Sequence, residues 1–130
     1  MKPKMPNYGR VFQGHGKPKE RAVFAAGLWK ETIADLAERG SLTAGLVKTV
    51  DRYVRASTEY EFLYPEAMAE GPTLTAESGG QFANQRWHAV GKLNEQIGKL
   101  EAALGIPAKK PDGEAKKAQG RASAADDYLD

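Results

Sequence analysis

The sequence predicts a mainly α-helical fold, in which two long helices form a hairpin and a shorter helix precedes them. Apolar side chains recur at three- and four-residue steps over much of residues 22–104, and this spacing places them on one face of a helix. Glycine and proline interrupt the pattern at a few positions, which mark the ends of elements. A short β-ribbon is expected near residues 72–78, and both termini are expected to be flexible.

The first helix is expected from about Ala22 to Arg39. Trp29, Ile33 and Leu36 follow the helical spacing, so Trp29 is predicted to be a core residue. Gly40 follows at the position where a left-handed residue ends a helix.

The second helix is expected to begin after Thr43, whose hydroxyl suits an N-cap. It should run for about 22 residues, or roughly 33 Å, before Pro65. Pro65 is expected to kink it or to start a further turn through Met68. Gly71 and the proline after it should end the helix.

The alternating residues 73–76 predict the extended ribbon. Because one ribbon is unstable alone, we expect a helix or equivalent ribbons of neighbouring subunits to support it. Gly79 and Gly80 are interpreted as a turn, since neither the spacing nor the lysine of a phosphate-binding loop follows them. The third helix is expected from near Phe82 to Leu104.

An apolar seam with heptad-like spacing runs along this third helix and predicts that it packs against the second. The seam consists of Val90, Leu93, Ile97, Leu100 and Leu104. Gly91 and Gly98 lie beside the seam and suggest a closely approaching neighbouring backbone, whereas Gly105 is expected to cap the helix.

Residues suited to catalysis or metal binding are few. Cysteine is absent from the 130 residues, which excludes disulfides, thiol nucleophiles and thiolate metal sites. The two histidines, His15 and His88, lack the spacing of a metal site, and His88 is interpreted as an interhelical or surface side chain. We therefore expect no enzyme, no metal and no cofactor. With no apolar run of about 20 residues and no signal-peptide pattern, a soluble cytoplasmic protein without a membrane partner is expected.

Basic residues gather at the two ends of the chain. We expect a flexible basic arm over residues 1–20, a helical oligomerisation body over 21–106 and a mobile tail over 107–130, whose acidic end, Asp126–Asp130, either docks on a partner or is simply solvated. Basic ends suit contact with DNA phosphates, although they also suit a solubilising role. The candidate DNA-binding residues are Lys2, Lys4, Arg10, Lys17, Lys19 and Arg21, with Lys109, Lys110, Lys116 and Lys117 as a second set.

The apolar content predicts an oligomer. Apolar residues make up 41% of the chain, but many of them are alanines that bury little area. A small chain with so thin a core gains stability from association, so an oligomer is expected. The candidate interface residues are Tyr53, Tyr60, Tyr64, Trp87, Val90, Leu93, Ile97 and Leu100.

The stretch from about Ala22 to Ile106 resembles the phage terminase small subunits. It is similar to a branch with a Leu-Trp first helix, a Gly-x-Leu-Thr link, a long second helix, a Gly-x-Thr ribbon ending in Ser-Gly-Gly, and a last helix closing on Leu-Gly. The matching positions are Leu28, Trp29, Leu36, Gly40, Leu42, Thr43, Tyr53, Gly71, Thr73, Ser78, Gly79, Leu100, Leu104 and Gly105. The chain departs from the family at residues 83–85 and 106–109, where Asn-Pro and Thr-Pro-Ser are frequent.

The resemblance implies a function in viral genome packaging. Small subunits of this family form rings, bind double-stranded viral DNA at the packaging-initiation site, and recruit or regulate the large subunit, which holds the ATPase and nuclease. Such a protein works in the host cytoplasm. Two alternatives stay open: a helix-turn-helix regulator built on the link at residues 39–43, and a non-catalytic helical scaffold that binds only protein.

Overall fold

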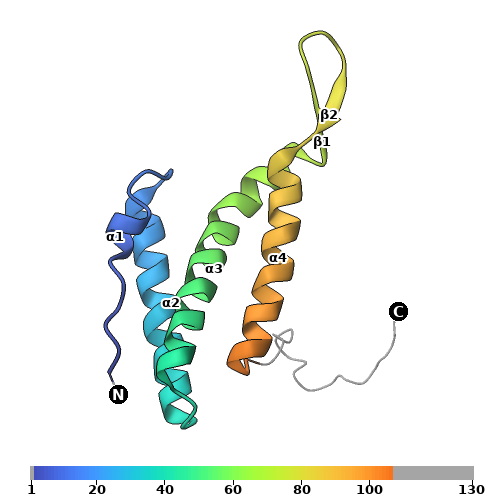
Figure 1. The fold of residues 1–130 in the computed structure, drawn as a ribbon. Coiled ribbons are helices and arrows are strands. Elements are labelled where there is room, and N and C mark those ends of the chain that lie inside the picture. Colours follow the sequence, from blue (N-terminus) through green and yellow to red (C-terminus); the bar gives the residue numbers. More distant parts are fainter. Residues whose placement is uncertain (1, 107–130) are drawn as a thin grey trace, which may run out of the picture.

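The structure is a computed structural model that describes residues 2–106 (Figure 1). The elements in chain order are α1 (Tyr8–Val11), α2 (Pro18–Glu38), α3 (Ala44–Glu70), β1 (Thr73–Thr75), β2 (Gln81–Ala83) and α4 (Gln85–Leu104). The predicted mainly α-helical fold is confirmed. Among residues 2–106, no helix has both the length and the apolar character that crossing a membrane requires.

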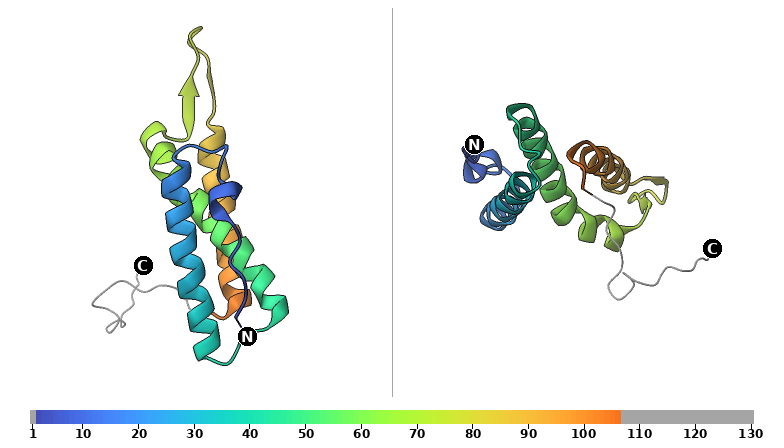
Figure 2. Two further views of the ribbon diagram at one scale, coloured as in Figure 1. Left: turned by 90° about the vertical axis from the view of Figure 1, so that its left-hand side faces the viewer. Right: turned by 90° about the horizontal axis from the view of Figure 1, so that it is seen from below.

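The central helix of the fold is α3. It contacts α2 on one side and α4 on the other, and α1 packs against α2 (Figures 1 and 2). The predicted hairpin of two long helices is therefore the α3–α4 pair. Arg39, just after α2, donates a hydrogen bond of 3.1 Å to the carbonyl oxygen of Leu104, which ties the end of α2 to the end of α4.

The predicted helix caps are found where the sequence places them. Gly40 has a positive φ of 69°, and the amide of Ser41 donates to the carbonyl of Leu36 at 2.9 Å, so α2 closes with a left-handed turn. The hydroxyl of Thr43 accepts a hydrogen bond of 3.2 Å from the amide of Leu46 and caps α3. These two caps fix the link between the antiparallel helices α2 and α3.

Helix α3 has 27 residues, because it continues through Pro65, as one of the two expectations for that residue allows, and it ends at Glu70. Its last turns lean towards α4 (Figure 1). Gly71 follows as the cap, with a φ of 84° that favours glycine. A proline inside a helix removes one backbone hydrogen bond and commonly bends the axis without ending the helix.

The predicted ribbon is confirmed at β1, but its partner lies in the same chain. Strand β2 pairs antiparallel with β1, with Leu74 opposite Phe82. The expectation that residues 82–84 begin the third helix is wrong. Gly79 turns the chain with a φ of 93°, so residues 81–83 return along β1, and Asn84 is the actual N-cap of α4. The resulting β-hairpin stands clear of the helices (Figures 1 and 2).

The N-terminal segment is packed onto the body, which contradicts the flexible arm expected at residues 1–20. Tyr8 and Phe12 are 3% and 2% exposed, and their rings stack with centroids 6.2 Å apart. Tyr8 also meets Trp29 edge to face at 6.4 Å. Two aromatic residues four positions apart give a single helical turn one apolar face. That face is sufficient to dock α1 on α2.

The start of α2 also precedes the expected Ala22, because Pro18 opens the helix at a position that favours proline. The hydrophobic core thus joins α1, α2, α3 and the end of α4. Its buried members are Tyr8, Phe12, Ala25, Trp29, Leu36, Val50, Tyr53, Val54 and Leu104. Trp29 is a core residue, as predicted.

Candidate nucleic-acid interface

A basic cleft lies between the N-terminal segment and the first half of α3. Its volume is about 370 Å³. The lining residues are Lys4, Pro6, Trp29, Val47, Lys48, Asp51 and Arg52. Lys48 and Arg52 are exposed and stand four positions apart, so they lie on the same side of α3. The packed N-terminal segment brings Lys4 to that pair, which is a juxtaposition that a loose arm would not make.

The one acidic residue of the cleft, Asp51, is engaged by neighbouring groups. Its carboxylate accepts a hydrogen bond of 2.8 Å from the hydroxyl of Tyr8 and is bonded by Nε of Arg55 at 3.0 Å. Burial, followed by the bond to this carboxylate, raises the pKa of Tyr8 far above its usual value. Within the described residues, Lys4, Lys48 and Arg52 form no ion pair. The cleft is therefore net positive.

A second acidic residue of α3, Glu59, is engaged in the same way. Arg21 donates hydrogen bonds to the carboxylate of Glu59 and, at 2.6 Å, to the carbonyl of Gly16. Nδ1 of His15 lies 3.2 Å from the same carboxylate of Glu59. The guanidinium of Arg21 is 5.0 Å from the ring centroid of Phe62 and its side chain is only 11% exposed. Arg21, predicted to contact DNA, thus holds the turn before α2 against α3. Arg21 is therefore not part of the candidate interface.

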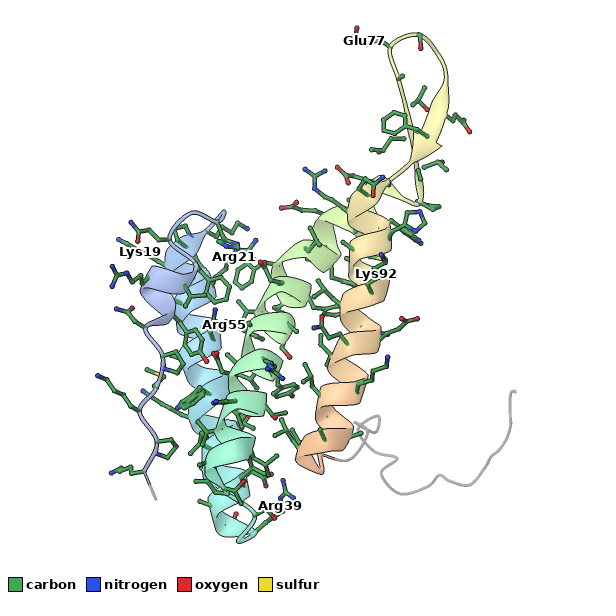
Figure 3. The ribbon with its side chains drawn as sticks, in the orientation of Figure 1. Lys19, Arg21, Arg39, Arg55, Glu77 and Lys92 are labelled. Carbon is green, nitrogen blue, oxygen red and sulfur yellow. The ribbon has the colours of Figure 1, made fainter. Side chains whose placement is uncertain are left out.

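The other N-terminal candidates are exposed but spread out. Lys4 lines the cleft beside the first half of α3, Lys2 lies two positions before it in the sequence, Arg10 lies in α1, and Lys17 and Lys19 lie at the start of α2. The N-terminal segment connects these places along one side of the molecule (Figure 1), and Lys19 is labelled at the upper end of that side in Figure 3. Lys109, Lys110, Lys116 and Lys117 lie outside the described residues, as does Asp126–Asp130.

Sequence reasoning missed Lys48 and Arg52 as members of the interface. Asp51, Arg55 and Glu59 share the helix with them, so the linear sequence reads as a face of mixed charge. In the structure, the carboxylates of Asp51 and Glu59 are engaged by other groups of the chain. The positive charges of Lys48 and Arg52 are therefore left without an acidic partner in the described residues. The four-residue step from Asp51 to Arg55 was the available signal, because it is the spacing of a helical ion pair.

Most of the candidate interface residues for self-association are used within the chain. Tyr53 and Val90 are 9% and 5% exposed, and burial, followed by the nearby carboxylates of Glu101 and Glu31, raises the pKa of Tyr53. Leu93, Ile97 and Leu100, which are half-buried, belong to the predicted seam on α4, the helix that packs against α3.

The remaining candidates lie nearer the surface. Trp87 and Tyr60 are half-buried, and Tyr60 stacks on the 42% exposed Tyr64 with ring centroids 5.3 Å apart. A Cβ added at Gly91 or Gly98 would meet nothing within 4 Å in the described chain, so the close approach suggested by these glycines is not made inside one subunit.

The described residues offer no metal site, because no three His, Asp or Glu side chains gather within them. His88 is exposed, which agrees with the surface alternative of its interpretation.

The comparisons with known proteins give one match. Residues 25–117 fit the family described as "Phage terminase, small subunit". The chain belongs to this family. No curated protein and no solved structure matches the chain significantly.

The part of the chain that matches the terminase small subunits begins within α2 and extends beyond α4. It contains Lys48 and Arg52, whereas Lys4 and the whole of α1 precede it. The candidate interface therefore combines two residues of the family region with one from the N-terminal segment.

Proposed function

We propose that this terminase small subunit binds double-stranded viral DNA at the packaging-initiation site and recruits or regulates the large ATPase-nuclease subunit. It does so in the host cytoplasm as a homo-oligomeric ring, without catalytic residues, metal or cofactor of its own. Membership of the family supports the role in packaging. The helix-turn-helix alternative loses support, because α2 and α3 are long antiparallel helices that pack side by side, rather than a short pair that presents one end to a groove.

The observation that carries the DNA-binding proposal is the convergence of Lys4, Lys48 and Arg52 on one cleft. Two come from one helix and one from a segment held by the aromatic core, so their mutual positions are set before DNA arrives. Phosphates attract such a cluster without regard to sequence. Lys2, Arg10, Lys17 and Lys19 extend the positive side along the same edge and are proposed as supplementary contacts.

A paired substitution tests the cleft. In the Lys48→Gln/Arg52→Gln variant, the affinity for duplex DNA should fall and the slope of log K against log salt should shrink by about 2 per engaged chain, at roughly 0.9 for each lost phosphate contact. The slope is measured by titrating labelled duplex at several salt concentrations. Neither residue is buried, so folding should be preserved.

The matched control removes the same charge from another surface. Lys92 and Lys99 are exposed on α4, and Figure 3 labels Lys92 on that helix, which lies beyond α3 from the N-terminal segment. The Lys92→Gln/Lys99→Gln variant should keep both affinity and slope. An equal loss in the two variants, or no loss in either, would refute the assignment of the cleft. Deleting residues 1–20 is a poor test because it also removes Tyr8 and Phe12 from the core.

A further inference from the structure

The β-hairpin carries an apolar face that has no partner in the described chain. Leu74 and Phe82 are directly paired, so both side chains project from the same face of the two strands. Phe82 is 51% exposed. The opposite face is polar, with Thr73 and Thr75 exposed. A two-stranded hairpin is only marginally stable in water, and an apolar face on it gains stability when it is covered.

The base of this hairpin is nevertheless fixed. The amide of Asn84 donates to the carbonyl of Pro72 at 2.9 Å, and its side chain donates to the carbonyl of Gly71 at 2.8 Å. Asn84 is 1% exposed and also caps α4. The hairpin thus projects from the joined ends of α3 and α4 in a set direction (Figure 2). A projecting element with an anchored base loses little freedom when its outer part docks.

The start of α2 carries an apolar surface of matching chemistry. An apolar hollow of about 580 Å³ is lined by Lys19, Glu20, Val23, Phe24 and Phe62. A second hollow of about 530 Å³ lies on the other side of Val23, against α1 and Pro18. Val23 is 74% exposed, although it is a β-branched aliphatic residue in the middle of this surface. We name this surface the α2 hollow.

The hairpin and the α2 hollow lie on opposite lateral sides of the molecule and towards the same end. Figure 1 shows the start of α2 on the left and the hairpin at the upper right, above the start of α4, with the last turns of α3 between them. One subunit cannot bring them together, because its own helices separate them. A second copy can, when it is placed beside the first and shifted along the helices, because the hairpin rises above the level at which α2 begins (Figures 1 and 2). Such a contact joins two different surfaces, so each subunit can bind one neighbour through its hairpin and another through its hollow. The row of subunits closes into a ring when the rotation between neighbours permits.

The charges of the two surfaces are also complementary. Glu77 is the only charged residue of residues 72–83 and lies at the hairpin tip (Figure 3). Lys19 lines both parts of the α2 hollow, and the exposed Lys17 is close to it in sequence. Because the acidic Glu20 lines one hollow beside Lys19, burial of Phe82 would be the main attraction in a contact between these surfaces, and a Glu77–Lys19 pair would set its orientation.

We propose that the hairpin of one subunit docks in the α2 hollow of a second copy of this chain, with Phe82 packed against Val23, Phe24 and Phe62. The contact rests on the self-association included in the proposed function, and it shares Lys19 with the supplementary DNA contacts. The DNA cleft formed by Lys4, Lys48 and Arg52 does not use this surface.

The test uses the full chain and two variants that each spoil one half of the contact. Phe82→Glu removes the apolar side chain that docks, and Val23→Glu places a charge in the hollow. Both residues are exposed, so the variants should still fold, which is checked by circular dichroism. The mass of each protein is measured by light scattering over a range of concentrations. Each variant should associate about tenfold or more weakly than the unaltered chain, as expected for a central apolar anchor.

Mixing the two variants gives the sharper result. The Phe82→Glu protein keeps an intact hollow, and the Val23→Glu protein keeps an intact hairpin, so an equimolar mixture should form heterodimers through one sound contact. These dimers should not grow into larger assemblies. A symmetric contact between two hairpins would give no heterodimer and no effect of Val23→Glu. Gln81→Glu is the control. Gln81 is next to Phe82 in the sequence, but its side chain projects from the opposite face of the hairpin, so the added charge should leave the assembly unchanged.

The outcomes separate this contact from the proposed function. An unaltered chain that stays monomeric at all concentrations overturns both self-association and the contact. An assembly that persists in Phe82→Glu or Val23→Glu, or a mixture without heterodimers, overturns the contact alone. Reversed charges give a final check: Lys19→Glu and Glu77→Lys should each weaken association at low salt, and the two changes combined should restore it.

Discussion

The packed N-terminal segment can be tested by truncating one of its aromatic side chains. Phe12 is 2% exposed, stacks on Tyr8, and meets the ring of His15 edge to face at 5.4 Å. Phe12→Ala removes the burial and leaves a cavity, for which buried phenylalanines lose about 3–5 kcal/mol. Because α1 is a single turn at the edge of the core and can partly collapse, we expect the lower end, about 3 kcal/mol. For a domain of this size, whose free energy of unfolding is roughly 5–15 kcal/mol, that is a large fraction.

Urea denaturation followed by tryptophan fluorescence measures the change directly, since Trp29 is buried against Tyr8. With a denaturant slope of about 2 kcal/mol per molar urea, a loss of about 3 kcal/mol lowers the midpoint by about 1.5 M. Stability of a self-associating chain depends on protomer concentration, so all variants are compared at one concentration. Gln13→Ala, at the exposed neighbouring position, is the control and should change stability by less than about 0.5 kcal/mol.

The reasoning is refuted if Phe12→Ala lowers the free energy of unfolding by less than about 1 kcal/mol, because removal of a ring that is buried in solution has a larger effect. The segment would then be loose in solution, as sequence analysis expected, and Lys4 would not be held beside Lys48 and Arg52.

Three further outcomes are expected. Because the pKa of Tyr8 is raised in the folded chain, just above pH 10 the phenolic proton of Tyr8 is lost only in the unfolded chain. Deprotonation therefore favours unfolding, and the melting temperature should fall as pH rises beyond about 10. Tyr8→Phe should reduce that fall without abolishing it, because Tyr53 contributes similarly; an unchanged pH profile would contradict the assignment. Asn84→Ala should cost about 2 kcal/mol in urea denaturation, through loss of a cap and of the bond to Gly71, whereas an effect below about 0.5 kcal/mol would show that the hairpin base is not anchored. Thr43→Ala should lower stability by about 1 kcal/mol, and Thr43→Ser, which keeps the capping oxygen, should restore most of it.

The helical body was predictable because its signals are local. Gly40 and Thr43 set the α2–α3 link through backbone conformation and one side-chain hydrogen bond, both readable from residue type. The seam on α4 was equally readable from its spacing. Strand β2 was not, because its three residues carry no alternation of their own and become a strand only when the turn at Gly79 returns them along β1.

The candidate site was predictable only in part. Prolines and glycines made residues 1–20 resemble a solvated arm, although Tyr8 and Phe12 stood at helical spacing within it. Whether a four-residue helix forms depends on a tertiary surface to dock on, and no local pattern reports that surface. The same is true of charge: Arg21 looked available until Glu59, far along the chain, was found beside it.

One unbroken helix carries both proposed contact regions. Lys48 and Arg52 lie near the beginning of α3, and the hairpin emerges just past its end, about 19 residues and roughly 30 Å further along. The helix therefore fixes the distance between the cationic cleft and the hairpin. In any closed assembly built through the hairpin, each subunit would present its cationic cleft at the same height and the same angular interval, so the diameter of the assembly would dictate the path that a bound duplex follows.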